Sequence, residues 1–183
     1  MASVRRQADR GLLFMLSKFC YSKNMGYSLE ELHEFLGKAT KATYAGNGGK
    51  AQSQRIGFTE FEYAEGKFAY RDSYAGFFTS AGQEVVWYGG NPIWTQQYSG
   101  GMERTYQNDK HSANQTYEFL KIVLSQGEKT VFQPRGPKEF AQGEWKYICE
   151  WTGDIASFEG QEQILHKDEV VFRHSFSGGV LRG

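Results

Sequence analysis

The feature that most constrains the fold of this chain is a pattern that occurs twice. Gly-Gln-Glu stands at residues 82–84 and again at 160–162, and Ser-Gly-Gly stands at 99–101 and again at 177–179. A spaced glycine–tyrosine–glycine pattern precedes both copies, as Gly66, Tyr70 and Gly76 and then as Gly143, Tyr147 and Gly153. A long-period repeat of this kind indicates two similar structural units within one fold.

Each copy has the pattern of a three-stranded antiparallel meander. We place copy one at residues 58–102 and copy two at 137–181, with 58–63 as an added strand in the first. Apolar and polar residues alternate along the segments, and Gly-Gly-Asn at 89–91 indicates a hairpin turn. A lone meander is marginally stable in water because one of its faces must still be covered. The two copies are therefore expected to bury their aromatic faces together or to join into one sheet.

Helical patterns lie outside the two meanders. Apolar residues recur at helical spacing over 3–22, Ser28 and Glu31 form a capping-box pattern for a second helix, and Asn114–Leu124 reads as a third. The small and polar residues 39–53 read as a loop. We predict an α+β fold, an antiparallel β-sheet of two repeated three-stranded meanders with about three packing helices. An N-terminal helical segment (1–27) would precede a single α+β domain (28–183).

Composition excludes several classes of function. Lys plus Arg number 21 and Asp plus Glu number 21, so there is no excess of positive charge for a nucleic-acid backbone or a membrane surface. No apolar run is long enough to span a membrane. Two cysteines far apart favour a reduced, cytoplasmic protein. No histidine stands at metal-ligand spacing, so we expect no metal and no cofactor. A homo-oligomer is left open.

The repeated Gly-Gln-Glu gives the first candidates for chemistry, Glu84 and Glu162. A twofold-like arrangement would bring both carboxyls into one cleft, where mutual repulsion would raise one pKa and create an acid and base pair. The alternative is that each glutamate caps its own turn or pairs with a nearby arginine, since a duplication repeats structural residues as well.

Positions where the copies differ give the candidates for binding. Asp72 and Tyr74 stand where copy two has Cys149 and Trp151, and Trp94 and Tyr98 stand where copy two has phenylalanines. Trp and Tyr combine apolar area with a hydrogen-bond donor and are favoured in pockets, although ordinary core packing is the alternative. The predicted lining of a cleft between the copies is Tyr44, Arg55, Asp72, Tyr74, Glu84, Trp94, Tyr98 and Arg135.

Several motifs together resemble a bacterial domain family of unknown function, whose members occur alone or behind Xre-type helix-turn-helix domains. The similarity is carried by Thr43–Gly46, Arg55-x-Gly57, the spaced residues Gly66 to Gly76, Gly82–Trp87, Pro92-x-Trp94, Tyr98-x-Gly100 and Arg135–Pro137. The resemblance implies no established reaction or ligand. The fused members imply a sensing or interaction module that biases a DNA-binding partner.

The leading hypothesis is a binding module that holds a small molecule or a protein partner between the two meanders. The alternative is an enzyme that uses Glu84 with Glu162 or Asp72 as an acid and base pair. A third class, a purely structural interaction protein, would present a large apolar patch and no cavity.

Overall fold

The computed structural model describes residues 26–46, 48–127 and 131–182. The chain divides into two compact units, Met1–Leu32 and His33–Gly183. The helix predicted over 3–22 lies outside the described residues, and the account below concerns the second unit except where the first is named.

The predicted capping box is present in the first unit, at the beginning of helix α2 (Leu29–Ala42). The Ser28 amide donates to the Glu31 carboxylate at 2.7 Å, and the Glu31 amide donates to the Ser28 hydroxyl at 3.1 Å. These two bonds satisfy amides that have no partner within the helix.

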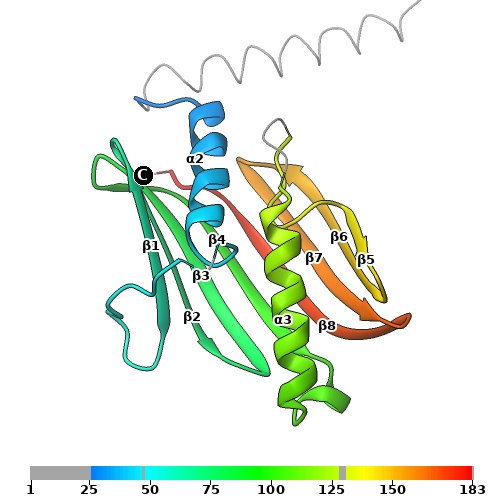
Figure 1. Cartoon of the computed structure of the whole chain (residues 1–183). Helices are drawn as coiled ribbons and strands as arrows, with labels where there is room; N and C mark the ends of the chain where they lie inside the picture. Colours follow the sequence, from blue (N-terminus) through cyan, green and yellow to red (C-terminus); the bar gives the residue numbers. More distant parts are fainter. Residues whose placement is uncertain (1–25, 47, 128–130, 183) are drawn as a thin grey trace, which may run out of the picture. The chain divides into compact units, whose positions relative to one another are not determined.

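The second unit is built on one antiparallel sheet of eight strands, in the order β1-β2-β3-β4-β8-β7-β6-β5 (Figure 1). The strands are β1 (Thr59–Glu65), β2 (Phe68–Gly76), β3 (Thr79–Tyr88), β4 (Asn91–Met102), β5 (Glu139–Gln142), β6 (Trp145–Asp154), β7 (Ser157–His166) and β8 (Glu169–Val180). With helices packed on it, this sheet confirms the α+β class.

The sheet consists of two meanders that meet along β4 and β8, where Tyr98 lies opposite Phe176. The register shifts after Val86 in the first half and after Ile164 in the second. Each half has four strands where the sequence predicted three plus one added strand in the first half only, because the four-residue β5 pairs with β6. Descent of the halves from one duplicated meander stays a prediction.

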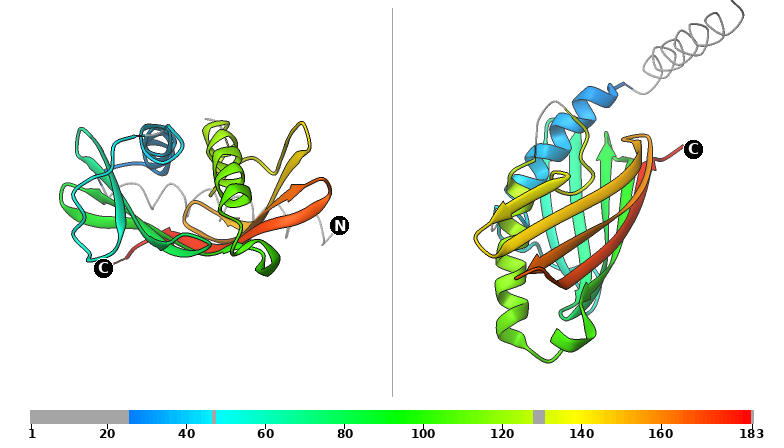
Figure 2. Two further views of the ribbon diagram at one scale, coloured as in Figure 1. Left: turned by 60° about the horizontal axis from the view of Figure 1, so that its bottom comes forward. Right: turned by 90° about the vertical axis from the view of Figure 1, so that its right-hand side faces the viewer.

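The two helices pack on the same face of the sheet (Figure 2). Phe35 of α2 stacks on Phe68 of β2 at 4.9 Å between ring centroids. Phe119 of α3 (Lys110–Ser125) lies 5.5 Å from Trp145 of β6. Each helix therefore covers one meander, and the sheet between the helices is left to form the floor of a cavity. The described residues also contain one 3-10 turn, η1 (Arg104–Tyr106).

Both helices are longer than their apolar patterns indicated. α3 begins at Lys110 because the Asp109 carboxylate accepts the Ser112 amide at 3.0 Å and caps the helix there. α2 continues to Ala42, into the stretch predicted as a loop. The Thr43 hydroxyl donates to the Ala39 carbonyl at 2.7 Å, so small residues that resemble a linker in sequence close this helix instead.

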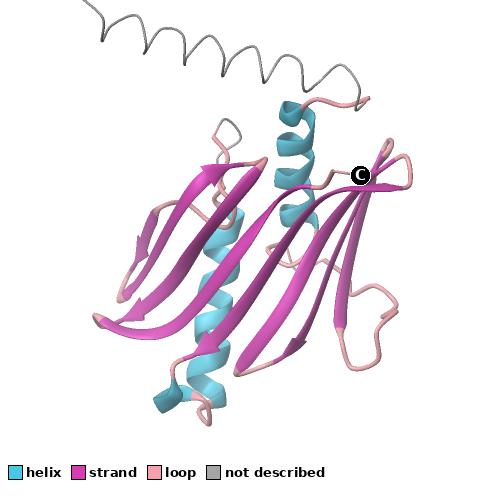
Figure 3. Cartoon of the chain, turned by 180° about the vertical axis from the view of Figure 1, so that it is seen from behind, coloured by secondary structure: helices cyan, strands magenta, loops and turns pink. Residues whose placement is uncertain are grey.

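The opposite face of the sheet carries exposed polar side chains such as Gln97, Ser99 and Gln161. Seen from behind, no helix of the described chain covers it (Figure 3). One solvated face is typical of an antiparallel sheet. None of the helices in the described ranges has the length and apolar character that a membrane crossing requires.

Candidate functional site

A cavity of about 1050 Å³ lies between α2, α3 and strands β2 to β4. Its walls are rich in tyrosines, which are Tyr44, Tyr70, Tyr74, Tyr98 and Tyr117. Lys41, Lys50 and Lys121 also line it. The volume lies at the upper end of the roughly 300–1000 Å³ that is usual for small-molecule sites, so a sizeable organic ligand fits.

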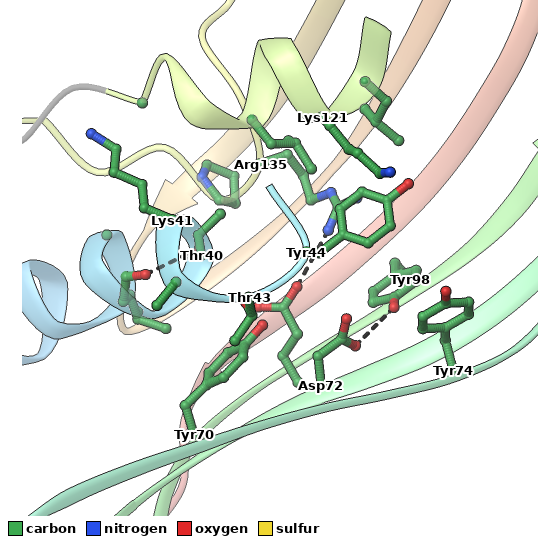
Figure 4. Close-up of a pocket in the computed structure, with 18 of the residues that line it drawn as sticks. Thr40, Lys41, Thr43, Tyr44, Tyr70, Asp72, Tyr74, Tyr98, Lys121 and Arg135 are labelled. Carbon is green, nitrogen blue, oxygen red and sulfur yellow. Dashed lines mark hydrogen bonds and ion pairs between the residues drawn. The ribbon is translucent and has the colours of Figure 1, made fainter. Parts of the chain in front are cut away.

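The floor of the cavity carries two facing carboxyls. Asp72 of β2 lies directly opposite Glu84 of β3, and Glu84 lies opposite Gln96 of β4. The three residues are 5 %, 8 % and 0 % exposed. Tyr98 donates its hydroxyl to Asp72 Oδ1 at 2.8 Å, and both side chains point toward the cavity (Figure 4). The pairing register of β2 and β3 therefore places two acidic side chains next to each other in a buried position.

One guanidinium serves two glutamates. Arg135 follows α3 in sequence, and its Nε donates to Glu162 Oε1 at 2.9 Å while its Nη1 donates to Glu84 Oε1 at 3.3 Å. The guanidinium carbon lies 4.9 Å from the centroid of the Tyr98 ring. Glu84 and Glu162 therefore do come together, but as the two partners of a buried arginine.

Glu162 is the better satisfied of the two glutamates. It also accepts the Tyr147 hydroxyl at 2.7 Å, and the His174 ring nitrogen Nδ1 lies 3.2 Å away. Burial alone would raise the pKa of Glu162, but the charge of Arg135 and the bonds from His174 and Tyr147 lower it to about 2. Glu162 is thus an ionised structural partner of Arg135.

Glu84 and Asp72 have the opposite character. Burial, together with the nearby charge of Asp72, raises the pKa of Glu84 to about 8 despite the opposing effect of Arg135. Burial also raises the pKa of Asp72 to about 6, against the bond from Tyr98 and the charge of Arg135. At neutral pH the floor therefore holds one protonated and one largely ionised carboxyl.

His174 completes the polar layer on the side of Glu162. Burial lowers its pKa, although Glu162 opposes the shift. A neutral ring that donates from Nδ1 to Glu162 leaves Nε2 to accept the Ser80 hydroxyl, 3.3 Å away. The histidine therefore adds a hydrogen bond to Glu162 and no charge.

All the predicted lining residues except Arg55 lie in the wall of this one cavity. Arg55 is exposed on the loop before β1, where its Nη2 lies 3.4 Å from Gln83 Oε1. Trp94 contributes from the core, 1 % exposed, with its indole N–H donating to the Ile155 carbonyl at 3.0 Å. Within the described ranges, no group of three or more His, Cys, Asp or Glu side chains is arranged to hold a metal.

The sequence reasoning missed Gln96 and His174. Gln96 Nε2 donates to Glu84 at 3.2 Å, as His174 contacts Glu162. The two residues stand at matching places after the two Gly-Gln-Glu motifs, so a comparison of the copies position by position would have found them. Lys121 and Tyr117 were missed because the apolar pattern of α3 does not show which of its polar side chains line the cavity.

Fold and site together define an α+β domain with a polar cavity on one face of a single antiparallel sheet. Residues 72–181, more than half of the chain, match the family described as a domain of unknown function (DUF5680), and the chain belongs to that family. The matched range contains Asp72, Glu84, Arg135 and Glu162. No curated protein and no solved structure matches the chain.

Proposed function

We propose that this domain is a binding module that holds a small molecule in the cavity between α2 and α3. The single observation that supports this most is the cavity floor, where Asp72 and Glu84 are buried side by side with open space above them. Burying ionisable groups is costly unless they are paired. A ligand that supplies the missing partner would remove that cost, and the tyrosine walls would provide its apolar contact area.

The proposal extends to the cellular role of the domain and to the origin of its two halves. We propose a bacterial, cytoplasmic sensing or interaction module whose two halves descend from one meander. The matching strand order and register shifts of the halves support the common origin, and the low cysteine content supports a reducing compartment. We further propose that a second protein binds this domain and responds to the bound ligand.

A screen of metabolites by thermal unfolding of the full chain tests binding. Gly37 lines the cavity on α2, and a Cβ there meets no atom within 4 Å, so a large side chain fits without backbone strain. We expect ligands to stabilise the wild type and Gly37→Ala, and to have no effect on Gly37→Trp, whose indole would take up part of the cavity. Equal stabilisation of Gly37→Trp would place binding elsewhere and contradict the proposal.

A second candidate function is acid–base catalysis on the bound molecule. It is favoured by the facing pair in which Glu84 has a pKa of about 8 and Asp72 of about 6, so that one is a proton donor and the other an acceptor near neutral pH. Glu162 is a poor partner for this chemistry because Arg135 holds it ionised. If Glu84→Gln abolished turnover of a bound compound while its thermal stabilisation persisted, the domain would be an enzyme.

A further inference from the structure

The described cavity floor contains more acidic groups than cations to pair with them. Asp72 and Glu84 are buried there and Glu162 is buried next to Arg135, which is the one buried cation in ion pairs with Glu84 and Glu162 in the described chain. Arg135 makes its shorter bond to Glu162, and no ion pair is formed by Asp72 among the described residues. With all three carboxyls ionised and Arg135 charged, two negative charges would remain without a cation.

Gln96 of β4 lies beside Glu84 and can form a hydrogen bond with that carboxyl in either of its protonation states. Its Oε1 atom is buried without a hydrogen-bond partner, while its Nε2 lies 3.2 Å from Glu84 Oε1. Turning the amide over exchanges these two atoms, which are alike in size and differ in that one donates and the other accepts. The Gln96 oxygen would then accept a hydrogen bond from the O–H of a protonated Glu84 carboxyl. Gln96 can therefore face Glu84 in either protonation state, as a donor to the carboxylate or as an acceptor from the protonated carboxyl.

The walls of the cavity restrict the kind of cation. Asp72 and Glu84 accept hydrogen bonds as well as charge, so the cation needs N–H donors, which a quaternary ammonium lacks. Tyr74 and Tyr44 line the cavity, and aromatic rings attract cations. Lys41 and Lys121 line the same cavity, and the Lys121 ammonium lies 5.9 Å from the Tyr44 ring centroid. A second positive charge on the ligand would meet these lysines, so the remainder of the ligand is neutral or acidic.

We propose that the ligand of this cavity is a primary or secondary amine with one positive charge, which binds between Asp72 and Glu84 and displaces the proton that Glu84 holds. This inference rests on the proposed binding function and names its ligand class. The exchange is balanced: the ammonium keeps its proton, the Glu84 carboxyl releases one to solvent, and a carboxylate–ammonium pair forms. No bond other than that O–H is broken.

The exchange predicts that affinity depends on pH. Glu84 faces Asp72 and Tyr70 on β2, Tyr98 on β4, Glu162 on β7, His174 on β8 and Arg135 before β5. Of these groups, Asp72 is already ionised above about pH 6 and Glu162 far below it, and Arg135 stays charged. Between pH 6 and 8 the released proton therefore comes from Glu84, and affinity for the amine rises by up to about tenfold per pH unit.

Titration calorimetry of the full chain with tyramine, 4-ethylphenol and 4-hydroxyphenylacetate tests the charge of the ligand, because the three probes share a phenol and differ in the charge of the substituent. Phosphate and MOPS buffers, which differ in heat of ionisation and contain no primary or secondary amine, count the released protons. Metabolites that stabilise the chain in the thermal-unfolding screen are grouped by net charge, and their affinities are compared in the same way. We expect tyramine to bind at least tenfold more tightly than either analogue, with close to one proton released at pH 7.

Three variants separate this inference from the proposed function. Asp72→Asn should lose at least tenfold in amine affinity, Glu84→Gln should lose the proton release and the pH dependence, and the exposed Glu159→Gln should behave as wild type. If neutral or acidic compounds bind best and Gly37→Trp blocks them, the amine inference is overturned while cavity binding stands. If compounds of no charge class bind, both proposals fall together.

Discussion

At the scale of single residues, two glutamates from the same Gly-Gln-Glu motif have opposite electrostatic roles. Glu162 accepts bonds from Arg135 and Tyr147 and contacts His174, whereas Glu84 has the longer contact to Arg135, a bond from the Gln96 amide and an acidic neighbour, Asp72. The difference arises from the residues that surround each position in the sheet, because the motif itself is identical.

This difference predicts opposite responses to the same substitution. Glu162→Gln leaves Arg135 with an uncompensated buried charge and should destabilise the fold by about 3–5 kcal/mol. Glu84→Gln replaces a protonated acid with an amide of similar shape and should match the stability of the wild type below pH 4.5. At pH 7 the variant should be the more stable by up to about 3 kcal/mol, because the folded wild type holds a proton that its unfolded chain releases. Urea unfolding of both variants beside Glu159→Gln measures this. Equal losses at Glu84 and Glu162 would show that the two carboxyls share one protonation state.

The raised pKa of Glu84 predicts how stability depends on pH. The unfolded chain has the ordinary glutamate pKa of 4.5 and the folded chain one of about 8, so folding retains a proton that the unfolded chain has lost. Stability contributed by this group is full below 4.5 and falls as the pH rises to about 8. The free energy of unfolding of wild type relative to Glu84→Gln should decrease by up to about 1.4 kcal/mol per unit between pH 6 and 8. A constant difference would contradict the assignment.

At the scale of secondary-structure elements, the glycine of each Gly-Gln-Glu motif makes room for an aromatic ring on the neighbouring strand. A Cβ at Gly82 would lie 2.4 Å from the Tyr98 hydroxyl oxygen, and one at Gly160 would lie 2.7 Å from Cζ of Phe176. The repeated glycine is therefore explained by packing, and in the first half it also positions the tyrosine that donates to Asp72.

Gly82→Ala should consequently displace the Tyr98 ring and weaken its bond to Asp72. We expect a loss of about 1–3 kcal/mol from overpacking, together with a lower affinity of the cavity for its ligand. Gly37→Ala is the matched control, because a methyl group there meets open space. Thermal unfolding and titration of the two variants provide the measurement, and unchanged binding by Gly82→Ala would mean that Tyr98 does not shape the site.

Most of the helices and strands could be predicted from the sequence, because each has a local pattern that locates it. Alternating residues and glycine turns locate the long strands, and the capping box locates the beginning of α2. The strand β5 was missed because its four residues contain one half-buried side chain, Phe140, which is too little for a pattern. Arg55 was placed in the site because it lies near other motif residues, but side chains on a loop point in directions that local sequence does not determine.

At the scale of the whole unit, the eight-stranded sheet has its centre at the β4–β8 pair and its edges at β1 and β5. Central strands are hydrogen-bonded on both sides and carry fully buried residues such as Trp94 and Phe172, whereas β5 is short and paired on one side. Local opening should therefore be rarest at the junction of the two meanders.

Hydrogen exchange of the full chain followed by mass spectrometry tests that expectation. Peptides from β4 and β8 should exchange most slowly, at rates near those of global unfolding, and a peptide covering β5 should exchange fastest among the strands. Ligand binding should add protection in β2 and β3, which carry Asp72 and Glu84. Slow exchange in β5 would indicate that another part of the chain or a second molecule covers this edge.

The second half of the sheet contains a less strained version of the floor, since Cys149 lies opposite Glu162 where Asp72 lies opposite Glu84. A thiol in that place repels no neighbouring acid, so electrostatic frustration is confined to one half of the molecule. Asp72→Cys would make the two halves alike at this position and should raise the free energy of unfolding. Asp72 therefore lowers the stability of the fold. Residues that lower stability in this way are typical of functional sites, where activity and stability compete.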